Sequence, residues 1–248
     1  MGAVAIVVAG GSGARLPGAV EKQFVTLGGR PVVVRALEAL AAAPEVGAIV
    51  LVVPRGREEF ARREMVGAFG VPRVAAVVAG GATRAASVRL GLAAVPADTD
   101  WVIVHDAARP LATAALAARV LAAAGETGAA VPAIPVADTV KRVRDGVVVE
   151  TVDRTGLWIV QTPQAFGQRT LVEAHARAER EGSDATDDAV LVERAGGRVR
   201  IVEGEPWNVK ITEAGDLALA EAIVAAREAG ASRGERADRH GAPRGRKP

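Results

Sequence analysis

Short apolar runs alternate along this chain with longer stretches of helical spacing, and this alternation restricts the fold more than any other feature. The runs of strand length are Val4–Val8, Ala48–Val53, Val74–Val78, Val102–Val104, Ala129–Ile134, Ile159–Val160 and Val199–Val202. The stretches of helical spacing are Val32–Ala43, Arg57–Phe69, Ala85–Val95, Ala112–Ala124, Arg169–Arg180, Asp187–Ala195 and Glu213–Ala229. Strands and helices in turn predict an α/β fold, a mainly parallel sheet with helices on both faces. Because ligands bind at the carboxyl ends of such strands, we expect the site in the loops after the first, third and fourth strands.

One segment breaks this alternation. Two extended runs, 138–144 and 147–152, flank Asp145-Gly146, and an Asp-Gly pair between extended runs is a strong hairpin signal. We therefore predict a β-arm at about residues 138–157. A two-stranded hairpin is marginally stable alone. The arm thus packs against a second subunit or folds back onto its own domain, and the pattern leaves both possibilities open.

The composition is that of a globular protein. The chain has 248 residues, and half of them are apolar, which is enough for a sizeable core. No apolar run reaches the roughly 20 residues that span a bilayer, and the first residues lack the basic start of a secretory signal. We expect a cytoplasmic protein. The absence of cysteine excludes disulfides and thiolate chemistry, so a metal ion would rest on oxygen ligands or on the three histidines.

Basic charge is concentrated at the end of the chain. Residues 231–248 carry six Lys/Arg and two Asp/Glu, whereas the whole chain has a net charge of only +2. This segment has no apolar period, so we predict a single domain over 1–230 and a disordered basic tail over 231–248. A solvated tail is favoured over a nucleic-acid arm, because aromatic residues at 3% offer few stacking platforms for bases.

A glycine-rich loop directly follows the first predicted strand. Gly10, Gly11 and Gly13 allow backbone N–H groups to turn toward phosphate oxygens, and Arg15 and Lys22 add two cations. The chain has only four lysines, so a lysine here indicates a site that needs a compact ammonium group. The loop lacks the third glycine of a dinucleotide fingerprint and the Gly-Lys-Ser/Thr of a Walker loop. We interpret it as a polyphosphate-binding loop.

Two further segments follow predicted strands. Gly80–Val88 is a glycine turn that opens into a helix, where Ser87 either faces a ligand or lies exposed beyond a capped helix start. Asp106 falls at the carboxyl end of a buried strand, where a carboxylate is a natural Mg²⁺ ligand, a helix N-cap or a partner of Arg109. We expect the neighbouring His105 to be a packed, hydrogen-bonded side chain.

Two cations lie in less regular surroundings. Arg154 ends the predicted arm, and Lys210 lies two residues after Asn208, the only asparagine in the chain. Each is either a site cation or a surface charge, and Arg154 alternatively forms a salt bridge within the arm.

The ordered set of motifs resembles the 2-C-methyl-D-erythritol 4-phosphate cytidylyltransferase family of the non-mevalonate isoprenoid pathway. The resemblance covers roughly residues 3–229. Its motifs are the glycine loop with Arg15 and Lys22-Gln23, Gly80-Gly81-x-x-Arg84-x-x-Ser87, the His105–Pro110 segment, Asp138-Thr139, Val152-Asp153-Arg154 with Gly156-Leu157-Trp158, Thr162-Pro163-Gln164, Thr186-Asp187-Asp188 and Asn208-Val209-Lys210. Any one of these motifs is weak, but their order is specific.

The resemblance implies a Rossmann-like nucleotidyltransferase sheet that transfers CMP from CTP to methylerythritol phosphate and releases pyrophosphate, with Mg²⁺ as cofactor. The implied catalytic residues are Arg15, Lys22, Arg154 and Lys210. The implied CTP-binding residues are Ala9, Gly10, Gly11, Ser12, Gly13, Gly81, Ala82 and Ser87. Substrate binding is implied for Asp106, Arg109, Thr139 and Thr162, and metal binding for Asp106. Ala82 stands where some relatives carry a polar residue, which leaves one cytosine or ribose contact open.

The resemblance also implies a homodimer in which the arms reach across, so that Arg154 completes the partner's site. We expect small-molecule substrates, and neither a nucleic acid nor a membrane as partner. We also expect a monofunctional enzyme, because the tail is too short for the synthase domain fused in bifunctional relatives. Two alternatives stay open. Ribitol 5-phosphate cytidylyltransferases share most of these motifs, and a nucleotide-binding regulatory protein would keep the fold without catalysis.

Overall fold

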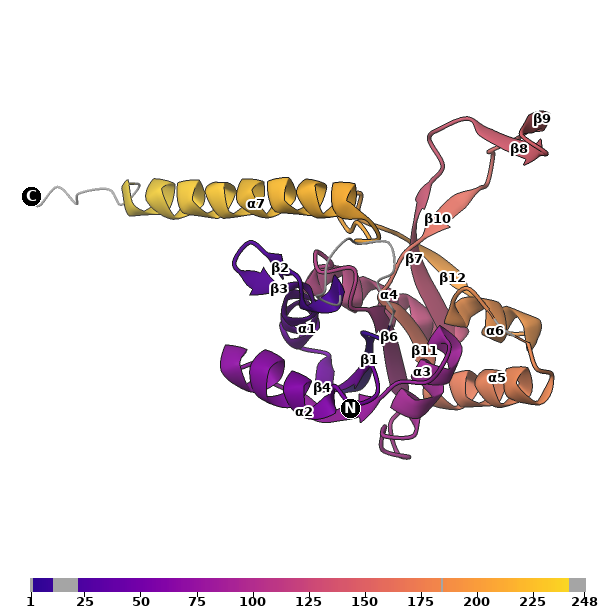
Figure 1. The fold of residues 1–248 in the computed structure, drawn as a ribbon, viewed down its shortest axis with the longest axis horizontal. Helices are drawn as coiled ribbons and strands as arrows, with labels where there is room; N and C mark the ends of the chain where they lie inside the picture. Colours follow the sequence, from indigo (N-terminus) through magenta and orange to yellow (C-terminus); the bar gives the residue numbers. More distant parts are fainter. Residues whose placement is uncertain (1, 11–21, 184, 241–248) are drawn as a thin grey trace, which may run out of the picture.

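A mixed eight-stranded sheet forms the centre of the molecule (Figure 1). The computed structural model describes residues 2–10, 22–183 and 185–240. The strands of the sheet are β1 (Ala3–Val8), β4 (Val46–Val53), β5 (Val74–Ala79), β6 (Trp101–Asp106), β7 (Ala129–Pro135), β10 (Trp158–Val160), β11 (Gln164–Gly167) and β12 (Arg200–Glu203). Their order is β10-β7-β11-β6-β1-β4-β5, and β12 pairs with β7.

Helices occupy most of the predicted helical stretches. They are α1 (Val32–Ala41), α2 (Glu58–Phe60), α3 (Arg84–Leu92), α4 (Ala114–Thr127), α5 (Gln168–Arg180), α6 (Asp188–Arg194) and α7 (Ala214–His240), with the 3-10 turn η1 (Lys22–Phe24) and the π-helical η2 (Ala61–Gly67). The predicted helix over 57–69 is thus divided between α2 and η2. The short pair β2 (Thr26–Leu27) and β3 (Arg30–Pro31) forms a separate two-stranded sheet.

Parallel pairing dominates the site-bearing half of the sheet. Strand β1 pairs in parallel with β4 and β6, and β4 pairs in parallel with β5. Strand β11 runs antiparallel between β6 and β7, and β10 is antiparallel to β7. The prediction of a mainly parallel α/β sheet is therefore confirmed, although β11 was not predicted from the sequence.

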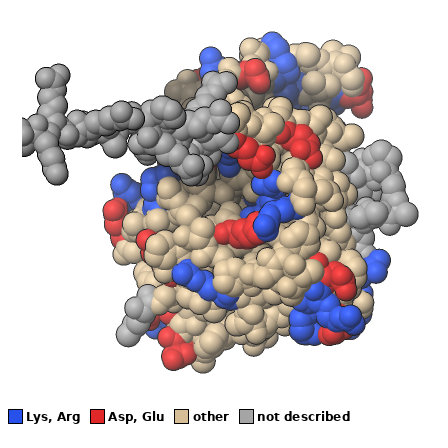
Figure 2. Space-filling model, turned by 90° about the vertical axis from the view of Figure 1, so that its left-hand side faces the viewer, with Lys and Arg blue, Asp and Glu red and all other residues tan. Residues whose placement is uncertain are grey.

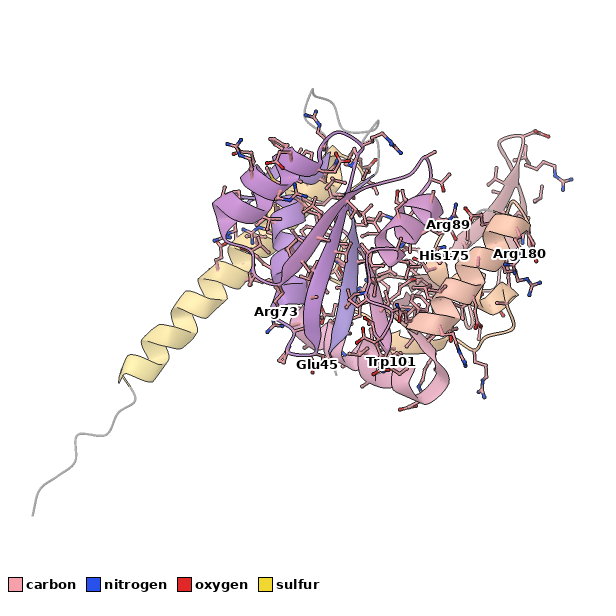
Figure 3. All side chains as sticks on the ribbon, turned by 90° about the horizontal axis from the view of Figure 1, so that it is seen from below. Glu45, Arg73, Arg89, Trp101, His175 and Arg180 are labelled. Atoms are coloured by element: carbon pink, nitrogen blue, oxygen red, sulfur yellow. The ribbon has the colours of Figure 1, made fainter. Side chains whose placement is uncertain are left out.

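The two faces of the sheet bury different sets of side chains. Along β1, Ala5 and Val7 belong to a core cluster with Leu37 of α1 and with α4, whereas Ile6 belongs to a second cluster that includes α3 and α5. Successive strand residues point to opposite faces, so a strand that is buried throughout needs helices on both sides. Figure 3 shows the helices arranged on the two sides of the strands. Each fully buried side chain such as Leu37 contributes about 2 kcal/mol.

The predicted arm is formed by β8 (Val140–Arg144) and β9 (Val147–Val152), which pair only with each other among the described strands. It projects away from the body of the molecule (Figure 1). Val147 and Val148 of the arm are 65% and 54% exposed. The arm therefore does not fold back onto its own domain, which was one of the two possibilities left by the sequence, and it exposes apolar side chains that favour a protein partner.

The last helix extends beyond its predicted end. Helix α7 continues to His240, whereas the sequence analysis placed the end of the helix at Ala229 and predicted a disordered basic tail over 231–248. Alanine, arginine and glutamate are good helix formers, so the backbone can continue as a helix without an apolar face. Residues 241–248 lie outside the described residues. In the described part of the chain, every helix is too short or too polar to cross a bilayer.

Candidate active site

Loops after β1, β5 and β6 surround a cavity of about 330 Å³. These are the loops that the sequence singled out. Ala9 and Gly10 follow β1, the segment from Gly81 to Ser87 follows β5, and Asp106 ends β6. Lys210 reaches the same cavity from the segment before α7, which is held in place because the Ile211 amide donates to the carbonyl of Ala108 over 2.8 Å. The carboxyl edge of the sheet therefore gathers residues from distant parts of the chain.

One wall of this cavity is a tight turn between β5 and α3. Thr83 caps α3 by accepting a hydrogen bond from the amide of Ala86. Ser87 is 2% exposed, and its Oγ donates to the carbonyl of Thr83 (2.9 Å) and accepts from the amide of Gly81 (3.1 Å). A Cβ on Gly81 would lie 2.6 Å from the Cβ of Ala86, so only glycine fits. The alternative of an exposed Ser87 is wrong.

The floor of the cavity is a cluster of charges around Asp106. Its Oδ1 lies 3.0 Å from Nε of Arg84, and its Oδ2 lies 2.7 Å from Nζ of Lys210. Burial acts to raise the pKa of the Asp106 carboxyl, but the two cations outweigh it and hold that pKa well below its ordinary value. Asp106 is therefore an anion with both oxygens in ion pairs. One interpretation of the sequence paired Asp106 with Arg109, but its partners are Arg84 and Lys210.

Arg84 connects this cluster to a second buried carboxylate. Its Nη1 lies 2.7 Å from Oδ2 of Asp188, which is itself 1% exposed. Burial acts to lower the pKa of Arg84, yet Asp188 and Asp106 raise it overall, so the guanidinium stays charged. The sequence analysis did not assign a role to Arg84 or to Asp188. Both residues stood in the quoted motifs, and that was the available signal.

A second cavity of about 180 Å³ adjoins the first. The two share Arg84, Asp106 and Lys210, and the second is also lined by Arg109 and Thr162. The shared charges thus form the boundary between two compartments, one below the glycine turns and one beside the segment that precedes β11.

Hydrogen bonds fix the walls of the second cavity. The hydroxyl of Thr162 accepts from the amide of Asp106 (3.1 Å) and is 2.9 Å from Nδ1 of His105. His105 Nε2 is 3.1 Å from the carbonyl of Arg109, so an Nε2–H tautomer satisfies both contacts. The guanidinium of Arg109 donates to the carbonyl of Asn208 over 2.7 Å. Thr162 and His105 therefore hold the loops together, as expected for a packed histidine.

Two predicted site residues lie away from both cavities. Thr139 and Arg154 are exposed residues at the base of the arm, and Nη1 of Arg154 donates to the carbonyl of Val136 over 2.9 Å. Within one chain the structure does not bring them to Asp106. Gly11, Ser12, Gly13 and Arg15 lie outside the described residues, as does the side chain of Lys22, so their roles stay predictions.

The face shown in Figure 2 carries separate groups of Lys/Arg and of Asp/Glu, so that both signs of charge are present on it. Within residues 2–10, 22–183 and 185–240, no group of three or more His, Cys, Asp or Glu is placed to hold a metal ion. The described carboxylates therefore do not form a complete cation site by themselves, and Asp106 suits Mg²⁺ only if phosphate and water oxygens complete the coordination.

Comparison with known proteins agrees with this arrangement. A sequence profile of the 2-C-methyl-D-erythritol 4-phosphate cytidylyltransferase family matches residues 3–226. The chain is 45% identical over 225 residues to the protein of that name from Pelotomaculum thermopropionicum, covering 90% of this chain and 94% of that one. It is 48% identical to the bifunctional enzyme IspD/IspF of Anaeromyxobacter dehalogenans, where the match covers 57% of the longer protein.

Solved structures show the same relationship. The 2-C-methyl-D-erythritol 4-phosphate cytidylyltransferase of Thermus thermophilus superposes with a TM-score of 0.75 at 38% identity, covering 90% of this chain and 98% of that one. The 4-diphosphocytidyl-2C-methyl-D-erythritol synthase of Anaerococcus prevotii gives 0.78 at 28% identity, with the same coverage. Fold, motif order and sequence identity agree. The chain belongs to the 2-C-methyl-D-erythritol 4-phosphate cytidylyltransferase family.

Proposed function

We propose that this protein transfers CMP from CTP to 2-C-methyl-D-erythritol 4-phosphate, forming 4-diphosphocytidyl-2-C-methyl-D-erythritol and pyrophosphate for isoprenoid biosynthesis. The observation that carries the proposal is the pair of adjoining cavities that share Arg84, Asp106 and Lys210. A nucleotidyl transfer needs a nucleotide site and an acceptor site that meet at the reacting phosphorus. The cavity beneath the glycine turns takes CTP, and the cavity beside Thr162 takes the acceptor.

The chemistry requires placement more than proton transfer. An oxygen of the acceptor phosphate, already anionic, forms a bond to the α-phosphorus of CTP while the bond to the bridging β-oxygen breaks. Pyrophosphate leaves with that electron pair, and no proton has to be removed from the nucleophile. The barrier lies in bringing two anions together and in the charge that develops at the α-phosphate, which fixed cations stabilise. Lys210 and Arg84 lie at the boundary where that charge develops.

On the nucleotide side, Gly81 and Ser87 form a rigid wall beside Ala9, Gly10 and Ala82. Gly81 allows the turn to pack against Ala86 at the start of α3, and the backbone of this turn lines the cavity where a planar base would bind. Gly11 to Gly13 would bind the triphosphate, and Arg15 and Lys22 would stabilise the charge that develops in the transition state. On the acceptor side, Lys210 and Arg109 supply the positive charge for the phosphate of methylerythritol phosphate.

We further propose a homodimer in which the arm of each chain completes the site of the other. The exposed valines of β8 and β9 support this arrangement, since an isolated hairpin with an apolar surface needs a partner. The position of Thr139 and Arg154 at the base of the arm, away from the cavities of their own chain, also supports it. In a dimer, these two residues would contact the acceptor bound by the partner.

Mg²⁺ is part of the same proposal. Asp106 would hold the ion through a carboxylate lone pair that its ion pairs with Arg84 and Lys210 do not use, while oxygens of the triphosphate and water would supply the remaining ligands. When bound, the ion neutralises phosphate charge and orients the triphosphate. Treatment with a chelator should abolish turnover and added Mg²⁺ should restore it, whereas full activity in the chelator would refute the requirement for the metal ion.

We assign the enzyme to the cytoplasm, where its nucleotide substrate is available.

A competition assay tests the function directly. Purified protein with CTP and Mg²⁺ is offered methylerythritol phosphate and ribitol 5-phosphate in parallel, and pyrophosphate release is measured. We expect turnover with methylerythritol phosphate and little with ribitol 5-phosphate. Turnover with ribitol 5-phosphate alone would assign the chain to that related activity. Absence of pyrophosphate with either acceptor, from protein that binds CTP, would favour the regulatory alternative.

A further inference from the structure

A network of one buried hydrogen bond and two ion pairs connects the interior of the protein to the boundary between the two cavities. Nε2 of His175 on α5 lies 2.9 Å from Oδ1 of Asp188, the first residue of α6. The other oxygen of Asp188 binds Arg84 at 2.7 Å, and Arg84 binds Asp106 at 3.0 Å. His175 lies on the side of α5 that faces the sheet (Figure 3). Helices α5 and α6 are thereby connected to the boundary between the two cavities.

The two innermost residues of this network, His175 and Asp188, touch neither cavity. His175 and Asp188 are each 1% exposed, and neither lines the nucleotide compartment or the acceptor compartment. Nδ1 of His175 is buried without a hydrogen-bond partner in the described part of the chain, and Nε2 is the ring nitrogen that donates to Asp188. Burial acts to raise the pKa of Asp188, but Arg84 and His175 lower it overall, and the carboxyl stays ionised.

Asp188 also has no role as a helix cap. Asp187 is the N-cap of α6, and its carboxylate accepts a hydrogen bond from the amide of Val190 at 3.1 Å. A second carboxylate next to it, fully buried, is costly unless it is paired. Its pairing with Arg84 and His175 satisfies both oxygens. The presence of a carboxylate at residue 188 is therefore explained by its contacts with these two side chains rather than by the stability of α6.

The contacts of Arg84 show that Asp188 fixes the orientation of its guanidinium. A guanidinium is a rigid planar fork, and two contacts on different nitrogens fix its plane. Nε is taken by Asp106 and Nη1 by Asp188, which leaves Nη2 buried and without a partner among the described atoms. Without Asp188, the fork is free to rotate and to bind both oxygens of Asp106, in competition with Lys210. The orientation of Asp106 and of Lys210 then changes as well.

We propose that Asp188 and His175 are positioning residues for the transfer reaction, which fix the plane of Arg84 and thereby set Asp106 and Lys210 at the boundary of the two compartments. The proposal rests on the function proposed above. Neither residue touches a substrate. Their effect is on the alignment of the reacting groups, so it should appear in kcat more than in the KM for CTP.

The test compares three variants with a matched control. Asp188→Asn keeps the size of the side chain but places an amide donor against Arg84 or His175, and His175→Leu removes the donor to Asp188. His175→Gln retains a donor at a similar reach. The control is Glu179→Gln, which breaks the more exposed ion pair of Arg89 with Glu179 (3.2 Å), a contact between the same helices α3 and α5.

Steady-state kinetics are measured at 25 °C with CTP and methylerythritol phosphate, together with the melting temperature of each variant. We expect Asp188→Asn to lower kcat about 100-fold, and His175→Leu about 10-fold, with the KM for CTP changed less than about threefold. His175→Gln should recover most of the loss, and Glu179→Gln should match the wild type.

Two results would overturn the proposal. One is a lower melting temperature for Asp188→Asn and His175→Leu with wild-type kcat, which would limit these residues to a structural role. The other is an equal loss of kcat in His175→Gln and His175→Leu, since hydrogen bonding to Asp188 would then not matter. The wild-type protein is measured first with both substrates. Its inactivity would refute the proposed function, whereas an active wild type with unaffected variants would refute only the positioning role.

Discussion

Lys210 and Asp106 are 104 residues apart in sequence, and their side chains meet at 2.7 Å in the centre of the site. Lys210 is 40% exposed in its side chain, whereas Asp106 is 12% exposed. The ammonium therefore faces the two cavities, and the more buried carboxylate holds it in place. An incoming phosphate meets a cation that is already oriented, and its approach requires little rearrangement.

We predict that Lys210→Met lowers kcat/KM about 100-fold, because a fixed cation is lost where charge develops. Steady-state rates of pyrophosphate release measure the effect. Arg200→Met is the control, since Arg200 also forms an ion pair, with Glu126 at 3.4 Å, but on the exposed surface. Equal rates for Lys210→Met and wild type would remove Lys210 from the machinery.

Lys22→Arg should lose most of the turnover although it keeps the charge. A planar guanidinium is wider than an ammonium and would displace the α-phosphate from its place in the glycine loop. The measurement is kcat at saturating CTP. Arg169→Lys, the reverse exchange at a side chain that is 92% exposed, serves as control. Near-normal turnover in Lys22→Arg would mean that charge alone suffices.

The stability of the protein should depend on His105 between pH 6.5 and pH 4. Burial lowers the pKa of His105 from 6.5 to about 4, against the attraction of Asp106. The unfolded chain binds the proton first, so the stabilisation is present above pH 6.5 and is lost as the pH falls toward 4. It amounts to about 3 kcal/mol in the free energy of unfolding.

Urea denaturation at several pH values checks this dependence. His105→Gln should show a flatter curve over the same interval. The carboxyls of Asp106 and Asp188, whose pKa values are lowered, begin to contribute their own pH dependence below about pH 5, so the slope between pH 6.5 and about pH 5 reports mainly on His105. The same slope in wild type and variant would assign the effect to another group.

Mixed subunits test whether the sites are shared. Arg154→Ala and Lys22→Ala proteins should each be nearly inactive, but a mixture that exchanges subunits should recover about a quarter of the wild-type turnover. The reason is that half of the dimers are mixed and each mixed dimer contains one intact site. No recovery in verified mixed dimers would place Arg154 in the site of its own chain.

The position of Asp106 was predictable because strand ends follow from the pattern of apolar residues. The pairing of Asp106 with Lys210 was not, because spacing along the chain carries no information on which loops meet. The burial of Ser87 could not be predicted either, for the same reason. A serine in the first turns of a helix is ordinarily exposed, and only the close packing of Gly81 against α3 buries it.

Arg84 and Asp188 were missed for a related reason. Buried ion pairs depend on how α3, α5 and α6 pack, and the sequence shows only that charged residues lie near helix starts. Thr186-Asp187-Asp188 did hold a signal, since one carboxylate caps a helix and a second needs another partner. Strand β11 was missed because Gln164–Gly167 is short and has too few apolar residues to suggest a strand.

The reversed direction of β11 changes which residues can serve the site. In a purely parallel sheet, the chain leaves each strand at the carboxyl edge, and only residues after a strand can reach it. Because Gln164 of β11 pairs with Val104 near the end of β6, the chain enters β11 at that edge. Gln161 and Thr162 are therefore delivered to the acceptor compartment before a strand. This short entry segment is a place where acceptor preference can diverge between relatives while the sheet stays unchanged.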